Sequence, residues 1–219
     1  MKKLDIPFYL TGGTALSRHY FNHRFSDDLV LFVNLDDSYE HYVELILQAF
    51  EASQKAGQFT IDYQRLRKEK DYSQFFLLQA IDSSQEKAEI KIDLVNDLAR
   101  HYGEFETHET LGRIDSWRNI LSNKLSAIFR YEAKDFVDIW IISTKRAFHW
   151  KEIIQEAKTK EVGIDPIVIY EILKSFPRDV LSSIKWNMPV DEKTFVDDLS
   201  IIADDIFKGN KNTLIGDIP

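Results

Sequence analysis

The fold is decided near the start of the chain, where residues 8–20 read FYLTGGTALSRHY. Residues 8–11 are mostly aromatic and aliphatic and predict a short strand, and residues 15–20 predict a helix. Gly12 and Gly13 join the two and expose free backbone N–H groups at the positive end of the helix dipole. This junction predicts a phosphate-binding turn, although two glycines at a strand–helix junction more often serve only the turn itself.

The rest of the first half predicts a mixed sheet. Residues 28–33, DLVLFV, are nearly all apolar, which favours a strand in a sheet covered on both faces. Asp37 is placed to cap a helix that begins at Ser38 and ends at Gly57. Three strands in an antiparallel meander and then a weaker hairpin are expected over residues 59–66, 74–81, 88–95 and 103–113.

The second half is helical. From Ser116 onward the spacing of apolar residues predicts helices over residues 117–131, 134–144, 150–160, 166–175 and 192–207. The sequence therefore predicts an α+β fold, with a mixed sheet and flanking helices at residues 1–115 and a helical bundle at residues 116–219. No linker separates the halves, so we expect them to pack together with a ligand-binding cleft between them.

The composition narrows the class of protein. The chain has 219 residues, a formal net charge of −8 and no cysteine. Without cysteine there is no disulfide, thiolate metal site or cysteine nucleophile. The negative charge argues against a general electrostatic grip on nucleic acid, so any such contact needs a local basic groove. No segment reaches transmembrane length and Asp5 breaks the basic start, which predicts a cytoplasmic protein without a membrane partner.

Two aspartates stand in otherwise apolar strands. The alternation of a strand places Asp28, Val30 and Phe32 on one face, and Asp93 is a second carboxylate in the strand at 88–95. If these strands are neighbours, the two carboxylates meet beside the glycine turn. Carboxylate and phosphate oxygens are the ligands that Mg²⁺ takes. Taken singly, each aspartate is more often a strand-end carboxylate bound to turn amides.

One lysine lies inside an apolar helical stripe. Lys124 faces inward on the first helix of the second half, so it needs a partner. It either packs or pairs for structural reasons, or it faces the cleft and binds a triphosphate. Asp135 and Asp138 share a face of the next helix, with Arg130 and Lys134 as candidate partners. For these two aspartates, an ordinary interhelical ion pair and a functional role are equally favoured.

Five motifs, taken in order, resemble the AbiEii/AbiGii toxin family of nucleotidyltransferases, which has a polymerase-β-type fold. They are YLTGGTAL at 9–16, HRFSDDL at 23–29, IKID at 90–93, NKLSA at 123–127 and KDFVD at 134–138. The resemblance implies a nucleotidyltransferase core followed by a helical domain. It also implies NTP and Mg²⁺ in the cleft, a toxin role, and a separately encoded antitoxin as partner. Relatives have been linked to the transfer of nucleotides onto tRNA 3′ ends, so the implied acceptor is an RNA hydroxyl.

The resemblance also implies roles for particular residues. Contacts to NTP phosphates would come from Gly12, Gly13, Thr14, Ser26 and Lys124. Metal ligands would be Asp28 and Asp93. The catalytic set would comprise Asp28, Asp93, Lys124 and Asp138, with Asp135 as a neighbour, and Arg24 and Ser26 match the segment that leads into the first metal aspartate.

One position departs from the family pattern. The family strand reads Asp-Leu-Asp, whereas this chain has Asp28, Leu29 and Val30, so the second metal carboxylate is missing. Asp27 does not replace it, because adjacent residues of a strand point to opposite faces. Three explanations stay open: residual activity with Asp28 and Asp93, a nucleotide-binding descendant without catalysis, or a change that inactivates a toxin. The leading hypothesis is a nucleotidyltransferase toxin, and the alternatives are a non-catalytic NTP-binding or interaction module and a plain structural domain.

Overall fold

The strands form one mixed sheet in the computed structural model, which describes residues 4–80 and 87–215. Within these ranges the strands are β1 (Tyr9–Thr11), β2 (Leu29–Asn34), β3 (Thr60–Ile61), β4 (Arg67–Lys68), β5 (Tyr72–Ala80), β6 (Lys87–Asp97), β7 (Glu106–His108) and β8 (Gly112–Ile114). Their order is β3-β5-β6-β2-β1-β8-β7, with β4 beside β5. β2 is parallel to β6 and β1 to β8, and the other pairs are antiparallel. The predicted mixed sheet is confirmed.

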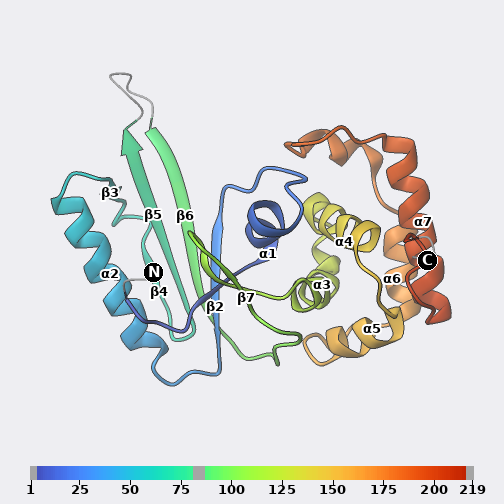
Figure 1. Cartoon of the computed structure of the whole chain (residues 1–219), viewed down its shortest axis with the longest axis horizontal. Coiled ribbons are helices and arrows are strands. Elements are labelled where there is room, and N and C mark those ends of the chain that lie inside the picture. The colour runs from blue at the N-terminus through green and yellow to red at the C-terminus, as the bar shows by residue number, and fades with distance from the viewer. Residues whose placement is uncertain (1–3, 81–86, 216–219) are drawn as a thin grey trace.

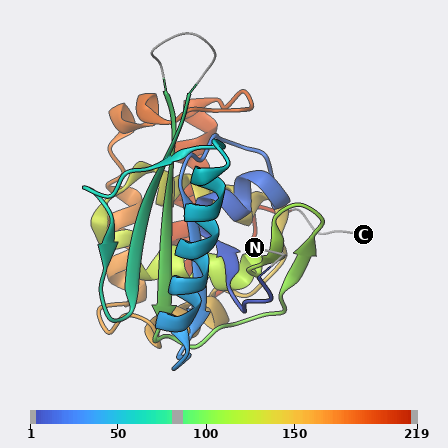
Figure 2. The same ribbon diagram turned by 90° about the vertical axis from the view of Figure 1, so that its left-hand side faces the viewer.

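Helices cover the sheet and build the second half of the molecule (Figure 1). They are α1 (Gly12–Ala15), α2 (Tyr39–Lys55), α3 (Trp117–Ser126), α4 (Ala133–Lys145), α5 (Trp150–Lys158), α6 (Pro166–Lys174) and α7 (Glu192–Lys208). α2 lies on one face of the sheet, while α1 and the C-terminal helices lie on the other (Figures 1 and 2). No helix in the described ranges combines the length and apolarity needed to cross a membrane. The predicted α+β class with a C-terminal helical part is confirmed.

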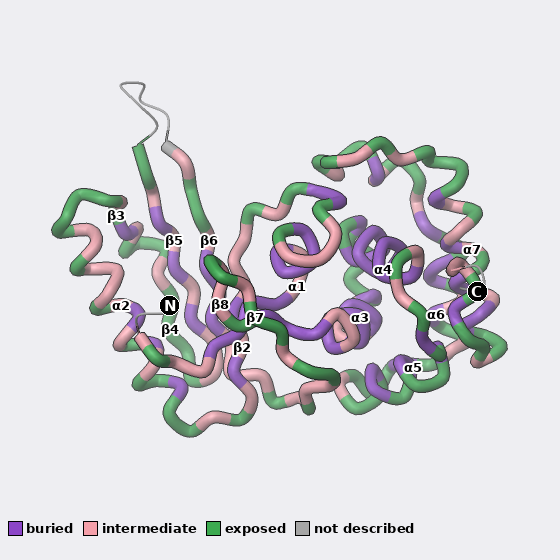
Figure 3. The backbone as a smooth tube through the Cα atoms, in the orientation of Figure 1, coloured by how far each residue is buried: buried purple, intermediate pink, exposed green. Residues whose placement is uncertain are grey.

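The two faces of β2 differ. Leu31 and Val33 are buried, whereas Val30 and Phe32 on the opposite face are only half-buried and border a cavity. Helices thus cover the sheet on both faces, as expected, but the cavity leaves the second face of β2 only half-buried. Figure 3 shows that buried residues are concentrated in the central strands and in the helices α3 and α4 opposite them. The apolar composition of β2 serves the core on one face and the wall of a cavity on the other.

Four predicted boundaries need correction. The helix after β1 begins at Gly12 itself and passes into a π-helical turn at Leu16–Tyr20. α2 begins at Tyr39 without the predicted cap from Asp37, because the turn before it is closed by a hydrogen bond from Ser38 N to Asp36 Oδ1.

The strand predicted over 59–66 is shorter in the structure, where β3 spans only Thr60–Ile61 because the chain turns after it. The predicted strand over 74–81 begins two residues earlier, at Tyr72, and Ile81 lies outside the described residues.

Candidate active site in the cleft between sheet and helices

A cavity of about 470 Å³ lies between the half-buried face of β2 and β6 and helix α3. Both halves of the chain contribute to its wall, and its volume falls in the usual range for small-molecule sites. The predicted site residues that border it are Gly12, Gly13, Thr14, Ser26, Asp28, Asp93 and Lys124. Asp138 is fully buried beneath it. The fold thus brings together residues from all five sequence motifs.

Positions 12 and 13 require glycine for different structural reasons. Gly12 has φ +67°, a backbone conformation that residues with side chains rarely adopt, and the space beside it is open. A Cβ at Gly13 would lie 2.2 Å from Nη2 of Arg24. Gly13 therefore leaves room for the Arg24 guanidinium, a role that the sequence motif does not reveal.

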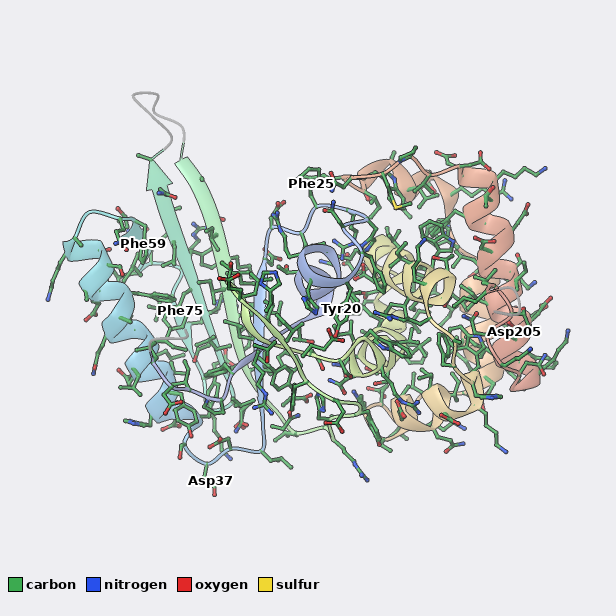
Figure 4. All side chains as sticks on the ribbon, viewed as in Figure 1. Tyr20, Phe25, Asp37, Phe59, Phe75 and Asp205 are labelled. Atoms are coloured by element: carbon green, nitrogen blue, oxygen red, sulfur yellow. The ribbon has the colours of Figure 1, made fainter. Side chains whose placement is uncertain are left out.

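Thr14 and Ser26 fasten the loop before β2 to α1. The Thr14 and Ser26 hydroxyls are 2.8 Å apart, and the Thr14 hydroxyl also donates to the carbonyl of Asp28. Farther out, Phe25 lies at the edge of the molecule (Figure 4), where its backbone N–H donates to the carbonyl of Lys185. Within the described ranges, the Asp28 carboxylate has no hydrogen bond or ion pair, and it faces the cavity.

Asp93 lies beside Val30. The parallel register of β2 and β6 aligns these two residues, as the alternation of the strands requires for one shared face. Asp93 Oδ1 accepts hydrogen bonds of 2.8 Å from Tyr72 and Gln74, and Oδ2 pairs with Lys91 at 2.8 Å. An apolar valine thus occupies the position next to Asp93 where the family pattern has an aspartate.

The acidic residues fit a Mg²⁺ ion only together with a nucleotide. In the described part of the chain, no group of three or more acidic, histidine or cysteine side chains is placed to hold a metal. Mg²⁺ is, however, commonly bound by one or two carboxylates plus substrate phosphates and water. Asp28 and Asp93 both border the cavity and offer this smaller set of oxygens.

A network of ion pairs lies beneath the cavity. Arg24 donates two hydrogen bonds of 2.8 Å to the Asp138 carboxylate. His23 Nε2 lies 3.0 Å from the same carboxylate, and Lys124 Nζ pairs with it at 2.7 Å. Burial alone would raise the pKa of Asp138, but Lys124, His23 and Arg24 together hold it far below its ordinary value.

Lys124 extends this network to a second carboxylate. It also pairs with Asp135 at 2.7 Å, which in turn pairs with Arg130 at 2.7 Å. Burial would lower the pKa of Lys124, but Asp138 and Asp135 raise it. The lysine therefore stays charged at the wall of the cavity. Lys134, by contrast, forms no ion pair with a described residue and also borders the cavity.

At one end of the cavity, Lys160 binds Asn119 and Asn123, and none of these three residues was predicted to belong to the site. Asn123 adjoins Lys124 in a recognised motif, but Lys160 has no signal in its spacing. In all, six basic and four acidic described side chains border the cavity. A local excess of positive charge thus exists in a chain of net charge −8.

The Arg24 contact leads to a prediction for Gly13→Ala. Its methyl group should push the guanidinium off buried Asp138 and lower the free energy of unfolding by about 3 kcal/mol, as for a broken buried ion pair. Gly12→Ala is the matched control, because its methyl group meets only open space and costs about 1–2 kcal/mol of backbone strain. Urea denaturation measures both. Equal losses in the two variants would show that Arg24 moves aside freely.

These features define a class of protein. A mixed sheet, a glycine turn after its first strand, carboxylates on neighbouring strands and a helical second half together form a nucleotidyltransferase fold. The model of the nucleotidyl transferase AbiEii toxin family, of type IV toxin–antitoxin systems, matches residues 2–192. The chain therefore belongs to the AbiEii family.

Solved structures show the same fold. The crystal structure of JHP933 from Helicobacter pylori has 19% identity and a TM-score of 0.59, with 94% of this chain and 85% of that chain covered. A "putative nucleotidyltransferase" from H. pylori also has 19% identity, with a TM-score of 0.63 and coverage of 94% and 88%. A search of curated proteins finds no match to this chain.

Proposed function

We propose that the protein transfers a nucleotide from an NTP to an acceptor hydroxyl on RNA, such as a tRNA 3′ end, with Mg²⁺. One observation carries the proposal: the glycine turn, an inward-facing lysine and the two carboxylates Asp28 and Asp93 border a single cavity. Membership of the AbiEii family supports the reaction class. Under this proposal, residues 1–115 and 116–219 act as two domains that form the two walls of the cleft.

The phosphates belong at the end of the cavity near Gly12 and Gly13. Lys134 and Arg130 border the same cavity and supply positive charge. The Lys124 ammonium has three N–H donors, of which Asp135 and Asp138 use two. We assign the third donor to a phosphate oxygen, where it offsets charge on the departing pyrophosphate. Asp138 then acts as a positioning residue for Lys124 and Arg24.

The transfer itself is an in-line displacement. The acceptor oxygen forms a bond to the α-phosphorus, the bond from that phosphorus to the β-phosphate oxygen breaks, and pyrophosphate leaves while the hydroxyl proton passes to water. Asp28 and Asp93 would hold Mg²⁺, which when bound neutralises and orients the phosphates. Thr14 and Ser26 keep the segment that carries Asp28 in place.

Val30 favours a second candidate function. With an apolar side chain beside Asp93, the site lacks the charge that a second metal ion needs. A non-catalytic NTP-binding module of the same fold is therefore the alternative. In either case, the type IV family implies an antitoxin as biological partner, and we propose that it is separately encoded.

Transfer of label from α-³²P NTPs to an RNA pool tests the proposal. We expect labelled RNA with at least one NTP in the presence of Mg²⁺, and a strongly reduced signal with Asp28→Asn. A protein that binds NTP without labelling RNA supports the non-catalytic module. A folded protein that binds no NTP at all contradicts both functions.

A further inference from the structure

The cavity has a second end that the phosphate-binding residues do not reach. Asp28 precedes β2, whereas Asp97 pairs with Asn34 at the far end of the same two strands. Six residues of strand separate the two levels, which is about 20 Å. If phosphates bind at the glycine turn, as the proposed function requires, the nucleoside lies toward Asp97. On the sheet side this end holds Phe32, Asp97 and Ala99. Lys160, which lies close enough to Asp97 to interact with its charge, also binds Asn123, so Ile120 and Asn123 of α3 border the same end.

Its chemistry differs from that of the phosphate end. Phe32, Ala99 and Ile120 offer apolar surface, and the Asp97 carboxylate would repel a phosphate. All three donors of the Lys160 ammonium have partners, at 2.6 Å to Asn119 Oδ1, 2.5 Å to Asn123 Oδ1 and 3.5 Å to the Asn119 carbonyl oxygen. An uncharged, partly aromatic group fits these surroundings better than an anion does.

Lys160 fixes how the Asn123 amide is turned. An ammonium group has donors and no acceptor, so the amide atom that faces it must be the oxygen. Burial lowers the pKa of Lys160 to about 8, but this value is still above neutral pH, so the lysine is mainly charged there. Asn119 Nδ2 is bound to Asp115 at 3.0 Å, but Asn123 Nδ2 has no hydrogen-bond partner in the described part of the chain. Asn123 thus offers amide N–H donors at the cavity wall.

We infer that Asn123 is a specificity-determining residue of a nucleoside subsite. Its amide donates to an acceptor atom on the base or ribose of the bound NTP, next to the apolar surface of Phe32. Lys160 is the positioning residue that keeps the amide nitrogen turned toward the ligand. This inference rests on the proposed function.

Binding of the four NTPs and of inorganic tripolyphosphate to Asn123→Ala tests the inference. We expect the affinity for the preferred NTP to fall about five- to tenfold, which is the effect of one hydrogen bond. The differences in affinity among the four NTPs should therefore become smaller. Tripolyphosphate should bind within about twofold of the parent value, because it lacks a nucleoside. The control Asn187→Ala removes an exposed asparagine outside the cavity and should change neither value.

A second variant separates positioning from contact. Lys160→Met leaves Asn123 in place but frees its amide to rotate. The differences in affinity among the four NTPs should therefore become smaller in this variant too. Unchanged NTP affinities in Asn123→Ala would overturn the inference, and so would an equal loss for tripolyphosphate, which would place Asn123 at the phosphates. If the parent binds tripolyphosphate but no NTP more tightly, the nucleoside subsite fails while phosphate binding stands. If it binds neither, the proposed function fails and the inference with it.

Discussion

Val30→Asp is expected to raise Mg²⁺ affinity by about tenfold and to increase nucleotide transfer. The new carboxylate would lie beside Asp93 on the face that also carries Asp28, and a third carboxylate adds both charge and oxygen ligands for the metal. Without metal, an unpaired, partly buried carboxylate should cost about 1–3 kcal/mol of stability. Saturating Mg²⁺ should recover the lost stability, because a ligand that binds only the folded state stabilises it.

Val30→Asn is the matched control. It has the size of aspartate without the charge, so it should share the cost in stability and not the gain in metal affinity. Thermal unfolding with and without Mg²⁺, together with a metal titration, measures these quantities. If folded Val30→Asp binds Mg²⁺ no better than Val30→Asn, the metal site built on Asp28 and Asp93 is wrong.

Asp138→Asn is expected to lower the free energy of unfolding by about 3–5 kcal/mol, the usual cost of removing one partner of a buried ion pair. The substitution keeps the shape of the side chain but leaves Arg24, Lys124 and His23 around an uncharged amide. Urea denaturation at neutral pH measures the loss. Asp191→Asn is the control, because it changes an exposed helix cap where asparagine works equally well.

The pH dependence gives this prediction a second test. The pKa of Asp138 is lowered in the folded protein, so its contribution to stability is complete above the unfolded value of about 3.9 and fades as the pH falls below it. The difference in the free energy of unfolding between the parent and Asp138→Asn should therefore become smaller at acid pH. A difference that stays constant down to pH 2 would show that the charge of Asp138 is not the cause.

Local patterns were enough to predict much of the sheet and part of the site. Strand alternation placed Asp28 and Val30 on one face, and the structure puts both at the cavity. The inward position of Lys124 predicted that it has a partner, and Asp135 and Asp138 are its partners, although the expected partners of these two aspartates were Arg130 and Lys134. These predictions succeeded because each depends on the period of a single element.

Contacts between distant segments could not be predicted in the same way. Lys160 meets Asn119 only after α3 and α5 pack together, and nothing in the spacing of the sequence indicates that meeting. The reason for Gly13 likewise lies in Arg24, whose place depends on Asp138 more than a hundred residues away. The Asp37 cap failed because Asp36 and Ser38 offered the chain a competing local hydrogen bond.

Titration of the protein with NTP, in the presence and absence of Mg²⁺, tests the proposed nucleotide site most directly. Because Asp28 and Asp93 alone supply few ligands, Mg²⁺ without nucleotide should bind weakly, and NTP should bind much more tightly with Mg²⁺ than without it. Asp28→Asn should abolish most of that difference while the protein remains folded. NTP binding of equal strength with and without Mg²⁺, or no NTP binding by folded protein, would contradict the account.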